Sequence, residues 1–121
     1  MQIEQDISLA EDILGRWKSR IGKDFQGYRN HVYRMAHFCF ALSDASEEDR
    51  QKIIIAACFH DIGIWSDSTC DYLPPSMEQA RIYLDDQGLA DWKEETVRMI
   101  DLHHKIRRVT GSKYPLVELF R

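Results

Sequence analysis

The chain has 121 residues and a mass of 14.3 kDa, and its 44% hydrophobic and 30% charged residues exclude a disordered tail and allow one globular domain over residues 1–121. Lysines and arginines number 16 against 20 aspartates and glutamates, and this net charge of -4 argues against bulk binding of nucleic acid or of an anionic membrane. The N-terminal stretch is acidic where a signal peptide would be basic, and no apolar run approaches the roughly 20 residues of a membrane helix, so we expect a cytoplasmic protein.

The first two predicted helices are amphipathic. Apolar residues recur every three to four positions through the first twenty or so residues, and this pattern stops near Gly22. The same spacing predicts a second helix from about Gly27 to Ser43, with His31 at the edge of its apolar stripe.

A third helix is expected to begin at Ser46, which forms a capping-box-like start with Asp49, and to end at Gly63. Its run IIIAACFHD is apolar nearly all round, so this helix should lie at the centre of the fold. Cys58 in this run, like Cys39 in the second helix, is expected to be a reduced thiol that packs as a small hydrophobic side chain.

The second half of the chain predicts a long loop and further helices. Residues 64–75, which contain a Pro-Pro pair, are expected to form the loop. A fourth helix should begin with Ser76 as its cap and end at Gly88, and a fifth should be capped by Asp91 and run to about Arg108.

A last short helix is expected to open near Pro115 and to reach Arg121 after about two turns. This helix ends without a capping residue, and its apolar stripe needs another apolar surface to pack against. We therefore expect the natural chain to continue. The same stripe would suit a homodimer contact. Since no strand pattern appears, the expected fold is all-α, a compact helical bundle of five to six helices in one domain.

The dipeptide His60-Asp61 is the first candidate for chemistry. It places an imidazole beside a carboxylate at the C-terminal end of an apolar helix. An unpaired carboxylate in that setting would cost several kcal/mol, so Asp61 needs a cation, and a bound metal would supply one. A second imidazole from another helix would complete a facial set of ligands.

The segment AACFHDIGIW, with NHVYRMAHF before it and MIDLHHKI after it, resembles the HD-domain superfamily of metal-dependent phosphohydrolases from about Tyr28 to Lys105. The resemblance implies an all-α bundle that binds one divalent metal, Mn, Fe, Ni, Co, Zn or Mg, through His31, His60 and Asp61. It also implies hydrolysis of a phosphate ester by a metal-bound water. The substrate would then be a small phosphorylated molecule such as a nucleotide.

Two departures from the family pattern concern the ligand set. The family's distal Asp ligand usually follows the His-His segment, and no such residue occurs before Arg121. Either this ligand lies in sequence beyond Arg121, which the unfinished last helix favours, or Asp101 replaces it. Asp101 and His104 are three residues apart on a helix and so share a face. The further His of two-metal members is also missing, which favours a single metal.

If a metal binds there, its chemistry suggests roles for the residues around it. Asp61 would orient or deprotonate the attacking water, and His103 or His104 would donate a proton to the leaving alkoxide. A basic cluster that includes Lys105 and Arg107 would hold the phosphate. The alternative for these cations and histidines is a structural role, because positive side chains in the last turn of a helix complement its macrodipole.

A second interpretation comes from a different class of function. A non-catalytic HD module would keep the ligands and use the bundle to bind a nucleotide or a protein partner, and the missing distal Asp favours it. His37 stays outside both interpretations, because it lies six residues beyond His31 and therefore on another helical face.

Overall fold

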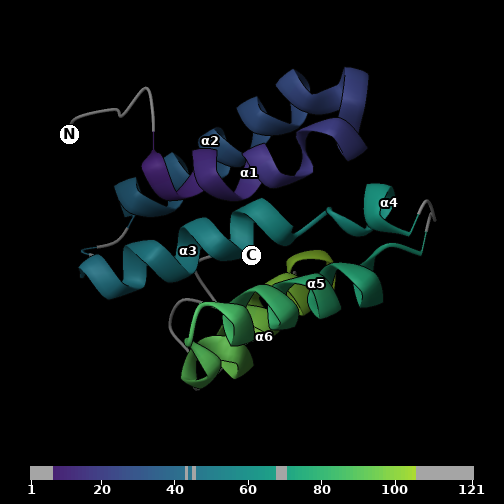
Figure 1. The fold of residues 1–121 in the computed structure, drawn as a ribbon. Helices are drawn as coiled ribbons and strands as arrows, with labels where there is room; N and C mark the ends of the chain where they lie inside the picture. Colours follow the sequence, from purple (N-terminus) through teal and green to yellow (C-terminus); the bar gives the residue numbers. More distant parts are fainter. Residues whose placement is uncertain (1–6, 43, 45, 68–70, 106–121) are drawn as a thin grey trace.

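The computed structural model describes residues 7–42, 44, 46–67 and 71–105, and of Leu42 and residues 102–105 it describes the backbone only. In these ranges the chain is helical and has no strand, which confirms the all-α class (Figure 1). The α-helices are α1 (Ser8–Ile21), α2 (Phe25–Leu42), α3 (Glu47–Phe59), α4 (Gly63–Ser66), α5 (Leu73–Asp86) and α6 (Lys93–Lys105). Among the helices described, none is both long and apolar enough to cross a bilayer.

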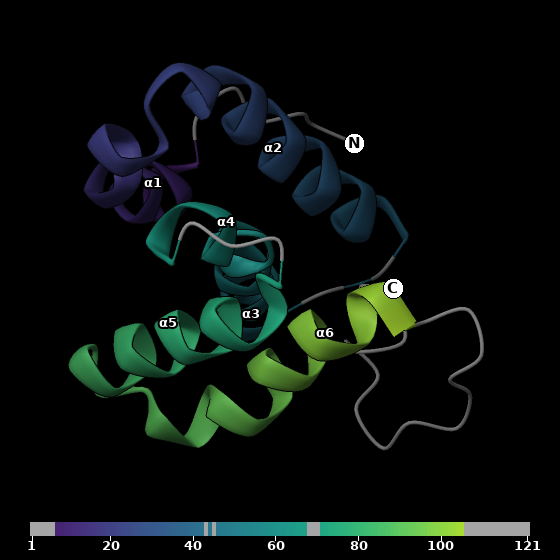
Figure 2. The same cartoon turned by 90° about the vertical axis from the view of Figure 1, so that its right-hand side faces the viewer.

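Helix α3 occupies the centre of the bundle, as its apolar sequence predicts. It packs against α1 and α2 on one side and against α5 and α6 on the other (Figures 1 and 2). All of its side chains from Ile53 to Phe59 are buried. Burial of each of the larger ones contributes about 1.5–3 kcal/mol, so the second half of α3 makes a large contribution to the stability of the core.

Local signals fix the ends of the first helices. The backbone N–H of Asp49 donates to Ser46 Oγ at 3.1 Å, which confirms the predicted cap of α3. Helix α1 ends at Ile21 and is followed by Gly22, whose φ of 65° lies in the left-handed region that favours glycine. A 3-10 turn over Gly22–Asp24 then leads directly into α2.

The predicted end of α3 at Gly63 is wrong. The α-helix ends at Phe59, and after a turn Gly63 begins the single-turn helix α4. The turn closes through hydrogen bonds from Ile62 N to the carbonyl of Phe59 at 3.2 Å and from Trp65 N to that of Ile62 at 3.0 Å. The sequence pattern did not separate this turn from the helix, because no glycine or proline interrupts the chain between Glu47 and Ile62.

The predicted start of the next helix at Ser76 is also wrong. Helix α5 begins at Leu73, so the Pro-Pro pair lies in its first turn rather than in a loop. Proline is tolerated there because backbone N–H groups of the first turn have no partner within the helix. Ser76 is buried, and its hydroxyl accepts a hydrogen bond from Gly63 N at 2.8 Å instead of capping the helix.

Helix α6 begins at Lys93, two residues after the predicted cap at Asp91. The intervening Ala90–Trp92 form a 3-10 turn, whose tighter winding carries the chain from α5 into α6. The described part of α6 ends at Lys105. The expected helix near Pro115 lies outside the described residues.

We predict that Gly63→Ala destabilises the fold. A Cβ at Gly63 would lie 2.1 Å from the carbonyl oxygen of Tyr72 and 2.9 Å from Ser76 Oγ, so backbone must shift to admit it. The expected loss is about 2–3 kcal/mol in the free energy of unfolding, measured by urea denaturation. Gly15→Ala is the matched control, because nothing lies within 4 Å of its added Cβ and alanine favours a helix. Equal stability of the two variants would contradict the prediction.

We predict that Cys39 and Cys58 resist alkylation in the folded protein. Burial raises the pKa of Cys39 to about 11 and that of Cys58 still further, so at pH 8 both remain thiols rather than reactive thiolates. Treatment with iodoacetamide at pH 8 should leave both cysteines unmodified in buffer. In roughly 6 M urea, which unfolds many small domains, the same treatment should modify both. Peptide mass spectrometry gives the readout, and rapid labelling in buffer would contradict the prediction.

Candidate metal centre

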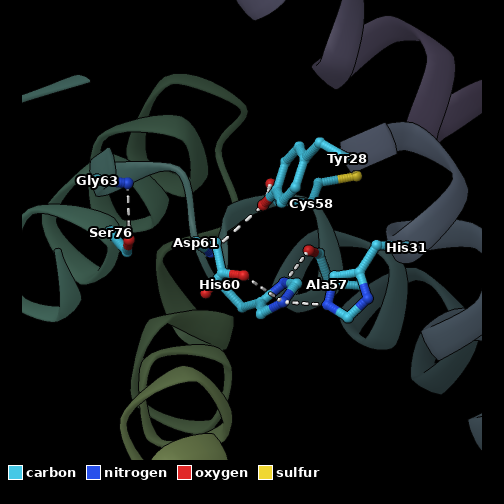
Figure 3. A network of polar contacts seen from close by, with 8 residues as sticks. All are labelled: Tyr28, His31, Ala57, Cys58, His60, Asp61, Gly63 and Ser76. Carbon is cyan, nitrogen blue, oxygen red and sulfur yellow. Dashed lines mark hydrogen bonds and ion pairs between the residues drawn. The ribbon is translucent and has the colours of Figure 1, made fainter. Parts of the chain in front are cut away.

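The candidate site lies where α3 ends. His60 follows the last residue of α3 and keeps helical backbone angles, and Asp61 comes next in the turn (Figure 3). The His60 side chain is fully buried, whereas the side chain of Asp61 is 20% exposed. The pair His60-Asp61, called the dyad below, therefore has a fully buried imidazole and an acidic side chain that is only partly buried, with its Oδ1 atom inside the fold.

Helix α2 supplies the second imidazole. His31 Nε2 lies 3.1 Å from His60 Nε2, and the two ring centroids are 5.0 Å apart (Figure 3). Asp61 Oδ2 lies 3.1 Å from the same His60 nitrogen. Each of the three residues offers one ligand atom, and these atoms all lie within 4.8 Å of one another. The structure thus brings together the three residues that the sequence analysis assigned to a metal.

His60 turns one ring nitrogen toward the backbone and the other toward His31 and Asp61. Its Nδ1 lies 2.5 Å from the carbonyl oxygen of Ala57. A carbonyl only accepts hydrogen bonds, so Nδ1 carries the proton, and in the neutral ring Nε2 then bears a lone pair. Metal-binding histidines are commonly fixed in this way through their other nitrogen.

The two spacings at His60 Nε2 fit a divalent cation. This nitrogen faces a carboxylate oxygen of Asp61, an arrangement that a positive charge between the two atoms would stabilise. Two ligands bound at right angles and about 2.1 Å from an ion are about 3.0 Å apart, close to both spacings at His60 Nε2. Mixed imidazole and carboxylate donors suit Mn, Fe, Co, Ni and Zn. Both the chemical types of the donor atoms and the two spacings at His60 Nε2 are therefore compatible with a bound metal.

His31 is held in the form that binds metals. Burial lowers the pKa of His31 below its ordinary value, and the nearby His60 lowers it further, whereas the carboxylate of Asp61 acts in the opposite direction. Because the ordinary value is already near 6.5, a lowered pKa keeps the ring neutral at pH 7. A neutral imidazole can donate its lone pair to a cation without first losing a proton.

Two tyrosines that the sequence analysis did not assign to the site also touch it. The Tyr28 hydroxyl donates to the carbonyl of Cys58 at 2.7 Å and accepts from Asp61 N at 3.3 Å. Burial and the charge of Asp61 raise the pKa of Tyr72, and so does a hydrogen bond to the Asp61 carboxylate. The one available signal for Tyr28 was its position one helical turn before His31.

The other residues that the sequence analysis assigned to the site lie on α6 or after it. The side chain of Asp101 is described, and the cluster of ligand atoms formed by His31, His60 and Asp61 does not include its carboxylate. His103, His104 and Lys105 lie in the last turn of α6, where the structure gives the backbone alone. Arg107 lies outside the described residues.

A surface hollow of about 220 Å³ lies elsewhere, between α1 and α5. Its lining includes Arg16, Arg20 and Tyr83, with Phe59 from the end of α3, and none of the three ligand candidates. The guanidinium of Arg16 already covers the Tyr83 ring at 5.5 Å. This hollow is therefore separate from the candidate metal centre.

We predict one Mn²⁺ ion per chain, with His31, His60 and Asp61 as ligands. Removing one ligand, by His31→Ala, His60→Ala or Asp61→Asn, should weaken Mn²⁺ binding on the order of 100-fold or more, as measured by calorimetry. His37→Gln is the control, since the His37 ring packs against Tyr33 and Phe40 rather than against the ligands. Wild-type protein without bound Mn²⁺, or equal loss in the control, would contradict the prediction.

Comparison with known proteins gives one family. The HD-domain family matches residues 28–116, which include all three ligand candidates and most of the chain. Searches of curated proteins and of solved structures found no match. The match begins at Tyr28 in α2 and continues through α3, α5 and α6, the helices that build and support the site. The chain belongs to the HD-domain family.

Proposed function

We propose that this protein is a metal-dependent phosphohydrolase that cleaves a phosphate ester of a small molecule. The observation that carries the proposal is the convergence of His31, His60 and Asp61 within 4.8 Å, at the His-Asp motif of an HD-domain chain. Members of this superfamily use such a set to hold a divalent metal for phosphate ester hydrolysis, and we extend that chemistry to this chain.

Each ligand has a distinct task in this proposal. A divalent cation supplies Lewis-acid chemistry: it lowers the pKa of water from 15.7 to about 7, so that hydroxide is available at neutral pH. His31 and His60 would hold the cation through ring nitrogens. The carboxylate of Asp61 faces His60 through Oδ2, and its other oxygen, the buried Oδ1, would orient the attacking water or accept its proton.

The proton for the leaving group must come from another residue than His60. Its Nδ1 is committed to the carbonyl of Ala57, and its Nε2 faces the other ligands. We assign this role to His103 or His104, in the last turn of a helix that packs against α3. Lys105 and Arg107 follow in sequence and would hold the phosphate of a substrate such as a nucleotide.

A second candidate function is a non-catalytic HD module that binds a nucleotide or a protein partner. The observation that favours it is the position of Asp101 outside the ligand cluster, which leaves three protein ligands within the described ranges. Three ligands can hold a metal whether or not the site turns over. The two candidates therefore differ in turnover rather than in metal binding.

Phosphate release from a panel of nucleotides and p-nitrophenyl phosphate, with added Mn²⁺, tests the proposal. We expect turnover in the wild-type protein, and for His60→Ala we expect only the rate of the metal-free control. Loss of the residue that donates the proton, by His103→Ala or His104→Ala, should lower kcat by about 100- to 10,000-fold. His37→Gln should keep the wild-type rate.

The negative outcomes separate the candidates. Mn²⁺ binding without turnover on any member of the panel would overturn the enzymatic proposal. Nucleotide binding by that inactive protein, measured by calorimetry, would then support the module. Full activity in His60→Ala would contradict both.

A further inference from the structure

The hydroxyl of Tyr28 touches the chain on both sides of the buried imidazole. It donates to the carbonyl of Cys58 at 2.7 Å and accepts from the backbone N–H of Asp61 at 3.3 Å. These two groups come from the residues that bracket Phe59 and His60. A single side chain of α2 thereby contacts the backbone at Cys58, two residues before the dyad, and at Asp61 within it (Figure 3).

The same helix carries His31, one turn further along. Residues three apart on a helix lie on one face, so the Tyr28 phenol and the His31 imidazole both reach the end of α3. Because α2 is continuous between them, a shift of α2 at Tyr28 would move His31 as well. A change in the contact of Tyr28 with the dyad would therefore change the distance between His31 Nε2 and His60 Nε2, which is 3.1 Å.

The surroundings of Tyr28 leave it little freedom. Its side chain is 6% exposed, and its ring stacks against His60 with centroids 5.9 Å apart. The Trp65 ring packs on it at 4.9 Å. A phenol held between two rings can define a position, which a mobile surface side chain could not.

We propose that Tyr28 is a positioning residue of the metal centre, whose hydroxyl sets the spacing between His31 on α2 and the pair His60-Asp61 at the end of α3. This inference rests on the proposed function, because it assumes that these three residues bind a metal. Tyr28 contacts the dyad's backbone and acts on the ligands only through their placement.

Tyr28→Phe tests the inference, since it removes the hydroxyl and keeps the ring. Tyr33→Phe is the matched control: Tyr33 lies on the same helix, is 7% exposed, and its hydroxyl accepts from Ile7 N at 2.8 Å and hydrogen bonds to Glu11. We expect Tyr28→Phe to weaken Mn²⁺ binding by about 10- to 100-fold, the usual effect of removing a group that orients ligands. Tyr33→Phe should stay within about threefold of the wild-type affinity, a limit taken from that same scale.

Two further readouts separate positioning from general loss of stability. The visible spectrum of bound Co²⁺ reports ligand geometry and should change in Tyr28→Phe but not in Tyr33→Phe. In protein without metal, the amide of Asp61 should exchange its hydrogen faster in Tyr28→Phe alone, because that amide loses its acceptor. Replacing Tyr28 by p-aminophenylalanine restores a hydrogen-bond donor toward the carbonyl of Cys58 and should recover most of the Mn²⁺ affinity. This variant also tests the inference if Tyr28→Phe folds poorly.

The outcomes distinguish this inference from the proposed function. If the wild-type protein binds Mn²⁺ and Tyr28→Phe binds it equally tightly with the same Co²⁺ spectrum, Tyr28 has no positioning role. If the wild-type protein binds no Mn²⁺, the proposed function is wrong, and the positioning role of Tyr28, which depends on it, is wrong as well. Equal losses in Tyr28→Phe and Tyr33→Phe would assign both effects to stability and overturn the inference.

Discussion

The structure depends on how the buried C-terminal carbonyls of α3 find hydrogen-bond donors. An α-helix leaves its last carbonyls without partners, and here the helix ends inside the core, where water cannot supply them. Three different donors solve this problem: the His60 ring for Ala57, the Tyr28 hydroxyl for Cys58, and the N–H of Ile62 for Phe59. Two of these donors also build the candidate metal centre, so the same contacts that end the helix orient the ligands.

The location of the site at the C-terminal end of α3 also favours a cation electrostatically. The C-terminus of a helix carries a partial negative charge, and cations are stabilised there by about 0.3–1 kcal/mol, more where the geometry is partly buried. A metal held by His60 and Asp61 would lie close to this end of the most buried helix. Binding would also stabilise the fold, since a ligand that binds only the native state shifts the unfolding equilibrium.

Much of this architecture could be predicted from the sequence, because its signals are local. Periodic apolar residues predicted α1 and α2, and a serine cap before a run that is apolar nearly all round predicted α3. The dipeptide His60-Asp61 indicated a metal ligand pair, and the resemblance to the HD-domain superfamily added His31. The start of α5 could not be predicted, because Ser76 looks like a cap and instead accepts from Gly63 across a tertiary contact. The part played by Tyr28 was hidden for a similar reason, since its position fits an ordinary core residue and only the folded chain shows its two partners.

The composition of the ligand set bears on what the site would attract. Two neutral imidazoles and one carboxylate bring a single formal negative charge, so a doubly charged ion bound there would be only half neutralised. Centres with two or three carboxylates leave no such surplus. The remaining positive charge would favour anionic molecules over neutral ones of the same shape, and it would do so before any substrate-specific contact is made.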